Sequence, residues 1–258
     1  MFTNFKAKKS LGQNFLINLG VLDKIISAAE IKPSDIVLEI GPGKGALTKL
    51  LADKAKKVIT IEKDSRLINP LKESLEDFSN IEILENDILK FNPAHCSLLT
   101  GHYKIVANIP YYITSHLLRT IFEKWPRPEL IVLTVQKEVA KRITAKPPDM
   151  NLLALSVQLY SKPEIIGYIS KGSFRPIPKV DSAIIKLTPK PNVNIESVKK
   201  VLDLAKKAFA GKRKQIQNTL KNEVPNIETI LGEIGLEPSI RPEKLSIENW
   251  IKICSYLS

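Results

Sequence analysis

Short apolar runs alternate with segments of helical periodicity along the first half of the chain. Five runs have the length and the β-branched composition of buried strands, and they cover residues 36–40, 58–61, 81–84, 103–107 and 130–135. Apolar positions three and four apart predict amphipathic helices over residues 21–31, 46–55, 66–78 and 115–124. Strands that alternate with helices of about ten residues predict an α/β fold with a parallel, doubly wound sheet.

The pattern changes in the second half. A helix at residues 151–160 precedes two β-rich runs, 164–169 and 182–187, which we assign to an antiparallel end of the same sheet. Pro189-Lys-Pro191 marks a linker, and beyond it the periodicity is helical only, over residues 195–209, 212–221, 227–234 and 247–256. We therefore expect a basic arm (1–19), an α/β domain (20–189) and a small all-α domain (190–258).

Polar residues follow the predicted strands at their carboxyl ends, which is where an open α/β sheet binds its ligand. The glycines of residues 41–45 follow the first strand and would let a ligand approach the backbone and the next helix N-terminus. Glu62 follows the second strand, where a carboxylate can accept both hydrogen bonds of a ribose diol. Asp87 follows the third and can accept a hydrogen bond from an adenine amino group. These positions predict a nucleoside cofactor.

The glycine segment alone leaves alternatives open. It spells Gly-x-Gly-x-Gly, whereas a dinucleotide fingerprint spells Gly-x-Gly-x-x-Gly, and an NAD-binding sheet would carry nearly the same acid. A P-loop is disfavoured because Gly45, and no Ser or Thr for magnesium, follows Lys44. A purely structural turn is the remaining interpretation.

Asn108-Ile-Pro-Tyr111, after the fourth strand, favours methyl transfer over hydride transfer. The amino nitrogen of adenine is a weak nucleophile because its lone pair is delocalised into the ring. The Asn108 side-chain oxygen and the Ile109 carbonyl could accept its two N–H bonds, while Pro110 stiffens the turn and Tyr111 stacks on the base. The alternative is a strand-ending turn in which Asn108 is a cap and Tyr111 a packing residue.

A second segment, Phe174-Arg-Pro-Ile-Pro-Lys-Val-Asp-Ser182, is held extended by two prolines. Phe174 could cover the face of an extruded base opposite Tyr111, with Arg175 and Lys179 toward phosphate. The alternative is that Phe174 is a core residue beneath a loop.

Charge points to a polyanionic partner. The 258 residues are 43% hydrophobic and 26% charged, which excludes a disordered or collagen-like chain. Thirty-nine Lys and Arg against 27 Asp and Glu give a net charge of +12, which favours nucleic acid over a membrane surface. Three lysines in residues 1–15, and eight basic residues against one acid in residues 199–221, carry most of the excess. We expect these two segments to clamp the nucleic acid.

Other classes of protein are disfavoured. The two cysteines, Cys96 and Cys254, lie far apart, so we expect no disulfide framework and no metal site. We find neither the apolar core of a signal peptide nor an apolar run of the about 20 residues that span a membrane. We therefore expect a soluble, cytoplasmic monomer.

Taken in order, the motifs resemble those of the ribosomal RNA adenine N6-dimethyltransferases of the KsgA type, over essentially the whole chain. They are Lys9-Ser-Leu-Gly-Gln-Asn-Phe-Leu16, Glu39-Ile-Gly-Pro-Gly-Lys-Gly-Ala-Leu-Thr48, Glu62, Asn86-Asp87, Asn108-Ile-Pro-Tyr111, Phe174-Arg-Pro-Ile-Pro-Lys-Val-Asp-Ser182, Gly211-Lys-Arg-Lys214 with Asn218 and Leu220, and Arg241-Pro-Glu-Lys-Leu-Ser246.

The resemblance implies a Rossmann-like methyltransferase sheet and a helical domain that binds rRNA. It also implies that two adjacent adenosines in the 3′-terminal hairpin loop of small-subunit (16S) rRNA each receive two methyl groups during subunit biogenesis. The implied residues for S-adenosylmethionine are Asn14, Leu16, Gly41, Glu62, Asp87 and Asn108. Those for catalysis are Asn108, Ile109, Pro110, Tyr111 and Phe174.

Three other functions stay open at this point. Macrolide-resistance methyltransferases share the first domain but modify large-subunit rRNA, and the motifs at 211–214 and 241–246 favour the small subunit. A non-catalytic assembly or transcription factor is disfavoured by the intact Glu62, Asp87, Asn108 and Tyr111. An NAD dehydrogenase is disfavoured because no acid–base pair follows the sheet.

Overall fold

The structure, a computed structural model, describes residues 6–93, 102–211 and 214–256. Its contacts divide the chain into two compact units. The first contains residues up to 140 together with 163–189, and the second contains residues 141–162 together with those from 190 onward. Residues 141–162 thus pack with the C-terminal helices, whereas the sequence pattern had placed them in the domain ending at residue 189.

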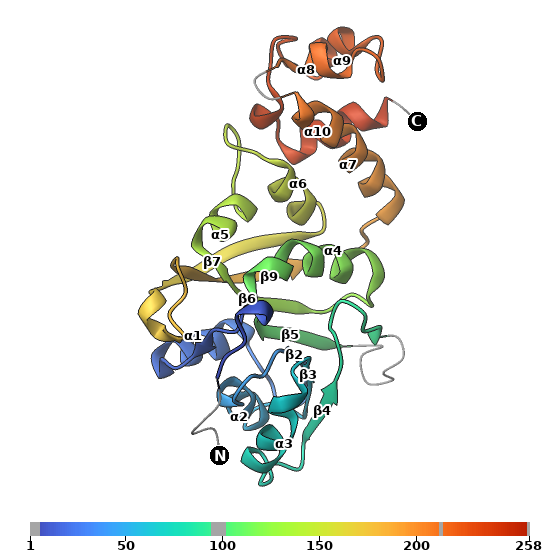
Figure 1. The fold of residues 1–258 in the computed structure, drawn as a ribbon. Coiled ribbons are helices and arrows are strands. Elements are labelled where there is room, and N and C mark those ends of the chain that lie inside the picture. Colours follow the sequence, from blue (N-terminus) through green and yellow to red (C-terminus); the bar gives the residue numbers. More distant parts are fainter. Residues whose placement is uncertain (1–5, 94–101, 212–213, 257–258) are drawn as a thin grey trace. The chain divides into compact units, whose positions relative to one another are not determined.

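A seven-stranded sheet forms the centre of the first unit within the described residues (Figure 1). Its spatial order is β4-β3-β2-β5-β6-β9-β7. The strands from β4 to β6 are parallel, and β9 is antiparallel to β6. The predicted doubly wound parallel sheet with an antiparallel end is confirmed. The strands are β2 (Ile36–Ile40), β3 (Lys57–Glu62), β4 (Ile81–Glu85), β5 (Tyr103–Asn108), β6 (Leu130–Gln136), β7 (Ser161–Ile169) and β9 (Ser182–Pro189).

The strand order reverses between β2 and β5. From β2 the chain builds outward through β3 and β4, and it then returns to the other side of β2 to begin β5. Loops that leave β2 and β5 therefore diverge in opposite directions and leave a crevice at the carboxyl edge of the sheet. The register places Ile40 beside Ala107, so the glycine loop and Asn108 border this crevice together.

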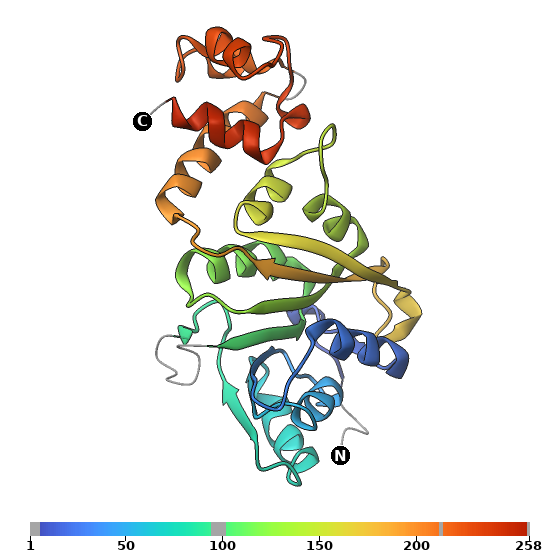
Figure 2. The same ribbon diagram turned by 180° about the vertical axis from the view of Figure 1, so that it is seen from behind.

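Helices cover both faces of the sheet. α1 (Leu19–Ala29) and α2 (Ala46–Ala52) lie on one face, and α4 (Thr114–Lys124) lies on the other (Figures 1 and 2). Because strand side chains alternate between faces, Val37, Val58 and Val106 pack together under α1 and α2. α3 (Ser65–Ser74) contacts β3 and β4 and runs through Pro70 as one helix.

Two short strands were missed by the sequence pattern. β1 (Phe15–Leu16) pairs antiparallel with β8 (Phe174–Arg175), so that Leu16 lies opposite Phe174. A segment of two residues has no measurable period, and its partner lies far along the chain. The pairing fastens the N-terminal arm to the loop before β9. The pattern also missed α5 (Lys137–Ile143), which directly follows β6.

The second unit is helical in its described residues. α7 (Ile195–Ala210) contacts α6 (Leu152–Gln158), α8 (Ile216–Leu220) and α10 (Ile247–Ser255), and α8 contacts α9 (Ile227–Glu233). Its core includes Trp250, which is fully buried with its ring 5.9 Å from that of Phe209. None of the described helices in either unit has the length and hydropathy needed to cross a membrane.

Lys104 makes a buried ion pair near the amino edge of the sheet. Its Nζ lies 2.8 Å from Asp35 Oδ2, and the two side chains are 7% and 10% exposed. The same ammonium donates to the carbonyl oxygen of Glu30 at 2.5 Å, at the left-handed residue that ends α1. The pair therefore joins the end of α1 and the residue before β2 to the start of β5.

We expect Lys104→Met to lower the free energy of unfolding by about 3 kcal/mol, because it leaves the Asp35 carboxylate buried without its partner. Lys186→Met is the control, since it removes an ion pair to Glu30, whose side chain is 62% exposed. That pair should contribute about 1 kcal/mol or less. Urea unfolding of both variants measures the difference, and equal losses would contradict the assignment.

Candidate functional site

A pocket lies at the carboxyl edge of the sheet, in the crevice between β2 and β5. Five segments line it: residues 11–15 of the arm, the loop after β2, the ends of β3 and β4, and the turn after β5. The pocket brings together eight of the ten residues that the sequence analysis singled out for the site. They are Asn14, Gly41, Glu62, Asp87, Asn108, Ile109, Pro110 and Tyr111.

Leu16 and Phe174 are not among the residues that line the pocket. Leu16 is 7% exposed and Phe174 is completely buried, and both belong to the apolar core under α1. Their pairing in β1 and β8 holds them there. The structure thus places Phe174 in the alternative position, as a core residue that anchors a loop, and its ring is not exposed to receive a base.

The glycine loop leaves room at the backbone. Gly41 has φ +68°, and a Cβ placed on it would meet no atom within 4 Å, so the space beside it is open. Gly43 has φ +58°, and its Cβ would lie 2.9 Å from the ring of Phe15. Side chains are thus excluded at Gly43 by conformation and by the arm, and at Gly41 they would fill the space that a ligand needs.

Two carboxylates present acceptor oxygens to the pocket. Glu62 accepts hydrogen bonds from the backbone N–H of Asp64 at 2.8 Å and of Gly43 at 3.4 Å, which aim the carboxylate, while burial raises its pKa. Asp87 accepts from Lys63 Nζ at 2.8 Å and from the Leu89 N–H at 3.1 Å. Its pKa is lowered, mainly by the hydrogen bond from Lys63.

A second acid lies beneath the loop. Glu39, on β2, is 1% exposed, and burial raises its pKa to about 8. Its Oε2 is buried and makes no hydrogen bond within the described part of the chain. Part of this rise in the pKa of Glu39 comes from the neighbouring charge of Glu62, and Glu39 is therefore largely protonated at neutral pH.

The side-chain amide of Asn108 is held from two sides. Its Nδ2 donates to the carbonyl oxygen of Asn14 at 3.0 Å, and its Oδ1 accepts from Thr134 Oγ1 at 2.5 Å. Beside it, the phenol of Tyr111 shares a hydrogen bond of 2.5 Å with Ser182 Oγ, and burial raises the Tyr111 pKa. The phenol is therefore neutral at physiological pH and is fixed in place, with Tyr111 lining the pocket.

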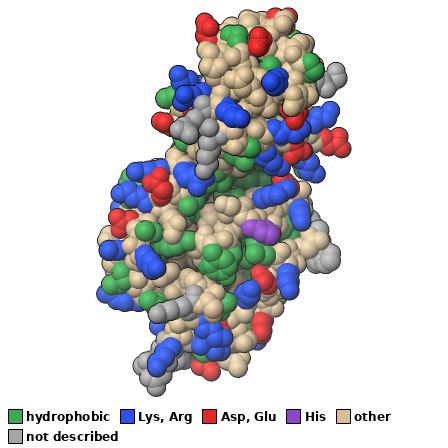
Figure 3. All heavy atoms as spheres, turned by 45° about the horizontal axis from the view of Figure 1, so that its top comes forward, with side chains coloured by type: hydrophobic (Ala, Val, Ile, Leu, Met, Phe, Trp, Pro, Cys, Tyr) green, Lys and Arg blue, Asp and Glu red, His purple; other side chains and the backbone are tan. Residues whose placement is uncertain are grey.

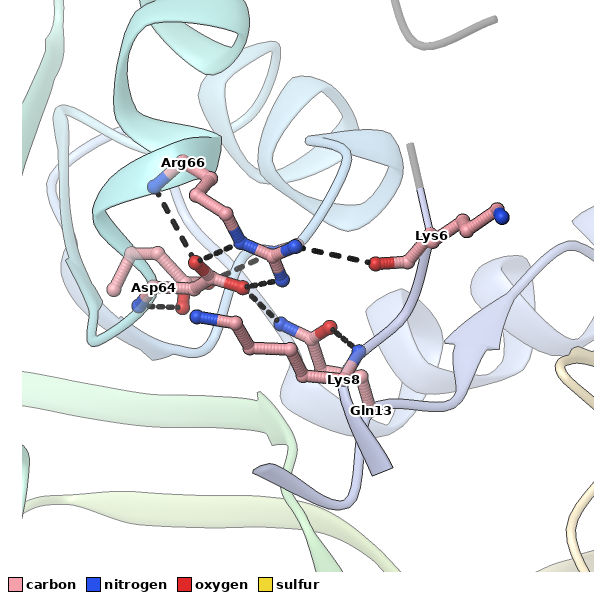
Figure 4. Close-up of polar contacts among 7 residues, drawn as sticks. Lys6, Lys8, Gln13, Asp64 and Arg66 are labelled. Carbon is pink, nitrogen blue, oxygen red and sulfur yellow. Dashed lines mark hydrogen bonds and ion pairs between the residues drawn. The ribbon is translucent and has the colours of Figure 1, made fainter. Parts of the chain in front are cut away.

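A polar clasp, formed by Gln13, Asp64 and Arg66, fastens the arm to the start of α3 (Figure 4). Gln13 Nε2 donates to Asp64 Oδ2 at 2.8 Å, while its Oε1 accepts from the backbone N–H of Lys8 at 2.7 Å. Arg66 donates to both Asp64 oxygens, at 2.8 and 2.6 Å, and lowers the Asp64 pKa to about 2. Sequence reasoning missed the clasp, although Gln13 lies in a quoted motif and Asp64 follows Glu62 closely.

Comparison with known proteins identifies the family. A family model described as "Ribosomal RNA adenine dimethylase" matches residues 4–258. The chain belongs to this family.

Individual members of the family are similar over nearly the full length. "Ribosomal RNA small subunit methyltransferase A" of Dehalococcoides mccartyi (strain CBDB1) is 44% identical over 96% of this chain and 88% of its own. The protein of the same name from Clostridium botulinum (strain Okra / Type B1) is 40% identical over 98% and 95%.

Two solved structures also match. A dimethyladenosine transferase from Plasmodium falciparum has a TM-score of 0.79 at 34% identity, covering 93% of this chain and 95% of its own. The 23S rRNA methyltransferase ErmE has a TM-score of 0.80 at 29% identity, covering 95% and 99%. The fold is thus shared with a protein named for the methylation of 23S rRNA and with one named as a dimethyladenosine transferase.

Glu39 allows a test of the electrostatics beneath the glycine loop. A pKa raised from 4.5 to about 8 means that the folded protein favours the protonated acid. The stability from this preference is complete below the unfolded pKa and is lost as the pH rises through the folded one. The neutral variant Glu39→Gln does not titrate. We expect its free energy of unfolding, relative to wild type, to grow between pH 5 and 8 by up to about 1.4 kcal/mol per pH unit.

Urea unfolding at a series of pH values measures this difference. Glu85→Gln is the control, because Glu85 is an exposed residue at the end of β4. Curves for wild type and Glu39→Gln that stay parallel across the range would show that Glu39 does not titrate as inferred.

Proposed function

We propose that the protein is an S-adenosylmethionine-dependent methyltransferase that dimethylates N6 of two adjacent adenosines in the 3′-terminal hairpin loop of small-subunit rRNA. One observation supports this most: Asn108-Ile-Pro-Tyr111 borders the same pocket as the glycine loop and Glu62. A fixed amide acceptor and an aromatic ring therefore lie at the edge of a crevice of the kind that binds a nucleoside cofactor. Family membership over residues 4–258 supports the same reaction.

The pocket fits the cofactor by its shape and by its hydrogen-bonding groups. Glu62 would accept from the ribose hydroxyls, Asp87 from the adenine amino group, and the open space beside Gly41 admits the ligand against the backbone. Asn14, in the arm, and Asn108 line the pocket at the point where the arm contacts the turn after β5. When bound, S-adenosylmethionine supplies an electrophilic methyl group. The clasp keeps the arm in place and helps to exclude water from the site.

The turn after β5 would hold the target adenine. The Asn108 Oδ1 and the Ile109 carbonyl oxygen accept from the N6 amino group, which favours a tetrahedral nitrogen with an available lone pair. Pro110 (φ −58°) fixes the turn, and Tyr111 offers its ring to the base. Because its phenol is neutral, Tyr111 presents no charge to the positive centre that methylation generates. Phe174 does not cover the other face of the base, since its ring is buried.

The small-subunit target is supported by the two relatives described above, which carry that target in their names and are 44% and 40% identical to this chain. The motif at 241–246 gives weaker support for the small-subunit target than the sequence suggested. Pro242 and Leu245 are buried, and Ser246 caps α10 with a reciprocal bond to Asn249, so these three residues of the motif serve the folding of the second unit. Lys212 and Arg213 of the other motif lie outside the described residues.

Exposed cations support rRNA as the partner. Lys and Arg side chains are spread widely over the face drawn in Figure 3. In the second unit, α7 and the residues after it expose Lys199, Lys200, Lys214 and Lys221. Lys206 and Lys207 are paired with Asp203 and Glu223. We infer that the exposed lysines contact phosphates of rRNA in the assembling subunit, with binding that weakens as salt rises.

Methylation of isolated subunits tests the function. The protein is incubated with S-adenosylmethionine labelled in its methyl group and with small subunits that lack the modification. We expect label in dimethyladenosine at two adjacent positions near the 3′ end of the small-subunit rRNA. Large subunits serve as the control, because ErmE, with the same fold, is named for 23S rRNA. Label in the large subunit alone would overturn the proposed target, and no label in either would overturn the activity.

Asn108 carries the sharpest prediction for the mechanism. We expect Asn108→Ala to lower the methylation rate at least about 100-fold, because positioned acceptors contribute factors of this order. Affinity for S-adenosylhomocysteine, measured by calorimetry, should fall by less than about tenfold, since one hydrogen bond is lost. Turnover that stays at the wild-type level would remove Asn108 from the mechanism.

A further inference from the structure

We propose that Thr134 is a positioning residue for methyl transfer: its hydroxyl locks the orientation of the Asn108 amide without touching either substrate. The inference rests on the proposed function, in which Asn108 accepts from the target amine. Thr134 lies within the apolar run of β6 and was not singled out by any motif.

Thr134 lies beside Asn108 because of the sheet register. β5 and β6 are parallel, and Asn108 and Thr134 are Cα partners in the ladder. By the alternation of side chains, Asn108 shares a face with Val106, and Thr134 shares the same face with Val132. The hydroxyl donates to Asn108 Oδ1 at 2.5 Å, Thr134 is completely buried, and it is not among the residues that line the pocket.

The two hydrogen bonds of the amide admit one orientation only. The carbonyl oxygen of Asn14 can only accept, so it requires Nδ2 on its side. The Thr134 hydroxyl then donates to Oδ1 on the other side. If the amide were turned by 180°, Oδ1 would face the Asn14 oxygen. Two acceptors would then lie against each other with no proton between them. The Asn14 carbonyl therefore selects the orientation from the arm, and the Thr134 hydroxyl, by donating to Oδ1, stabilises that orientation from the sheet.

This orientation matters because the adenine amino group is a donor. A carbonyl oxygen has two acceptor positions, and Thr134 occupies one on Oδ1, which leaves the other for the base. If the amide turns, its own N–H bonds face the target amine and no acceptor remains. Loss of the Thr134 hydroxyl should therefore slow transfer while leaving the binding of cofactor and RNA unchanged.

Three variants test this role. Thr134→Val keeps the shape and removes the hydroxyl, and Thr134→Ser keeps the hydroxyl. Thr60→Val is the matched control, since Thr60 is also fully buried and lies on the same face of the sheet, but on β3, which β2 separates from β5, with a long 3.5 Å hydrogen bond to the Glu82 carbonyl. We measure kcat and KM for subunit methylation, the Kd for S-adenosylhomocysteine, and the melting temperature.

We expect Thr134→Val to lower kcat about tenfold, in line with one lost hydrogen bond to a buried acceptor, with KM and Kd within about twofold of wild type. Thr134→Ser should recover most of kcat, and Thr60→Val should match wild type. In a single-turnover assay, adding Thr134→Val to Asn108→Ala should cause no further loss, because the two residues act through one amide.

Any of three results would overturn the inference: an unchanged kcat in Thr134→Val, losses of kcat and of binding in equal proportion, or a Thr134→Ser variant as slow as Thr134→Val. Wild type is assayed on the same subunits in parallel. An inactive wild type refutes the proposed function, whereas an active wild type with an unaffected Thr134→Val variant refutes only the role of Thr134.

Discussion

The parallel pairing of β2 with β5 is the constraint on which the site depends. It joins two strands whose following loops diverge, and its register sets the glycine loop beside the Asn108 turn. The residues proposed to bind the cofactor and the proposed acceptor of the target amine therefore lie together without any loop having to be long or specially closed. The buried pair of Lys104 with Asp35 secures the other end of the same strands, since it connects β5 to the residue before β2.

Most of the fold could be predicted because its central strands, β2, β3, β5 and β6, are buried on both faces and its helices on one. Such strands appear as continuous apolar runs, and the acids and amides at their ends stand out against them. Phe174 could not be placed in this way. A lone aromatic residue among prolines fits a stacking role and a core role equally, and its burial depends on Leu16, which lies far away in the chain. A strand of two residues that pairs with another such strand far along the chain leaves no periodic pattern in the local sequence.

The same limit explains which site residues were found. Glu62 and Asn108 end their strands, Asp87 lies two residues after β4, and all three are polar where the pattern expects a loop. Thr134 and Glu39 lie inside apolar runs, where a single polar residue is consistent with ordinary core packing. Their importance follows from register and burial: Glu39 lies beneath the glycine loop with an unpaired oxygen, and Thr134 lies opposite Asn108. Period two places Thr60, Glu62 and Asn108 on one face of the sheet, together with Thr134.

The contacts of the N-terminal arm determine when the pocket can be completed during synthesis of the chain. Residues 8–16 are synthesised before the residues that they bind, which are Asp64, Asn108 and, through β8, Phe174. The pocket therefore gains its arm-side wall only after the chain has been synthesised through β8, at Phe174–Arg175. A nascent chain that ends before β8 lacks the partner of β1, so ligand binding would report on the folding of the whole first unit and not on its early strands alone.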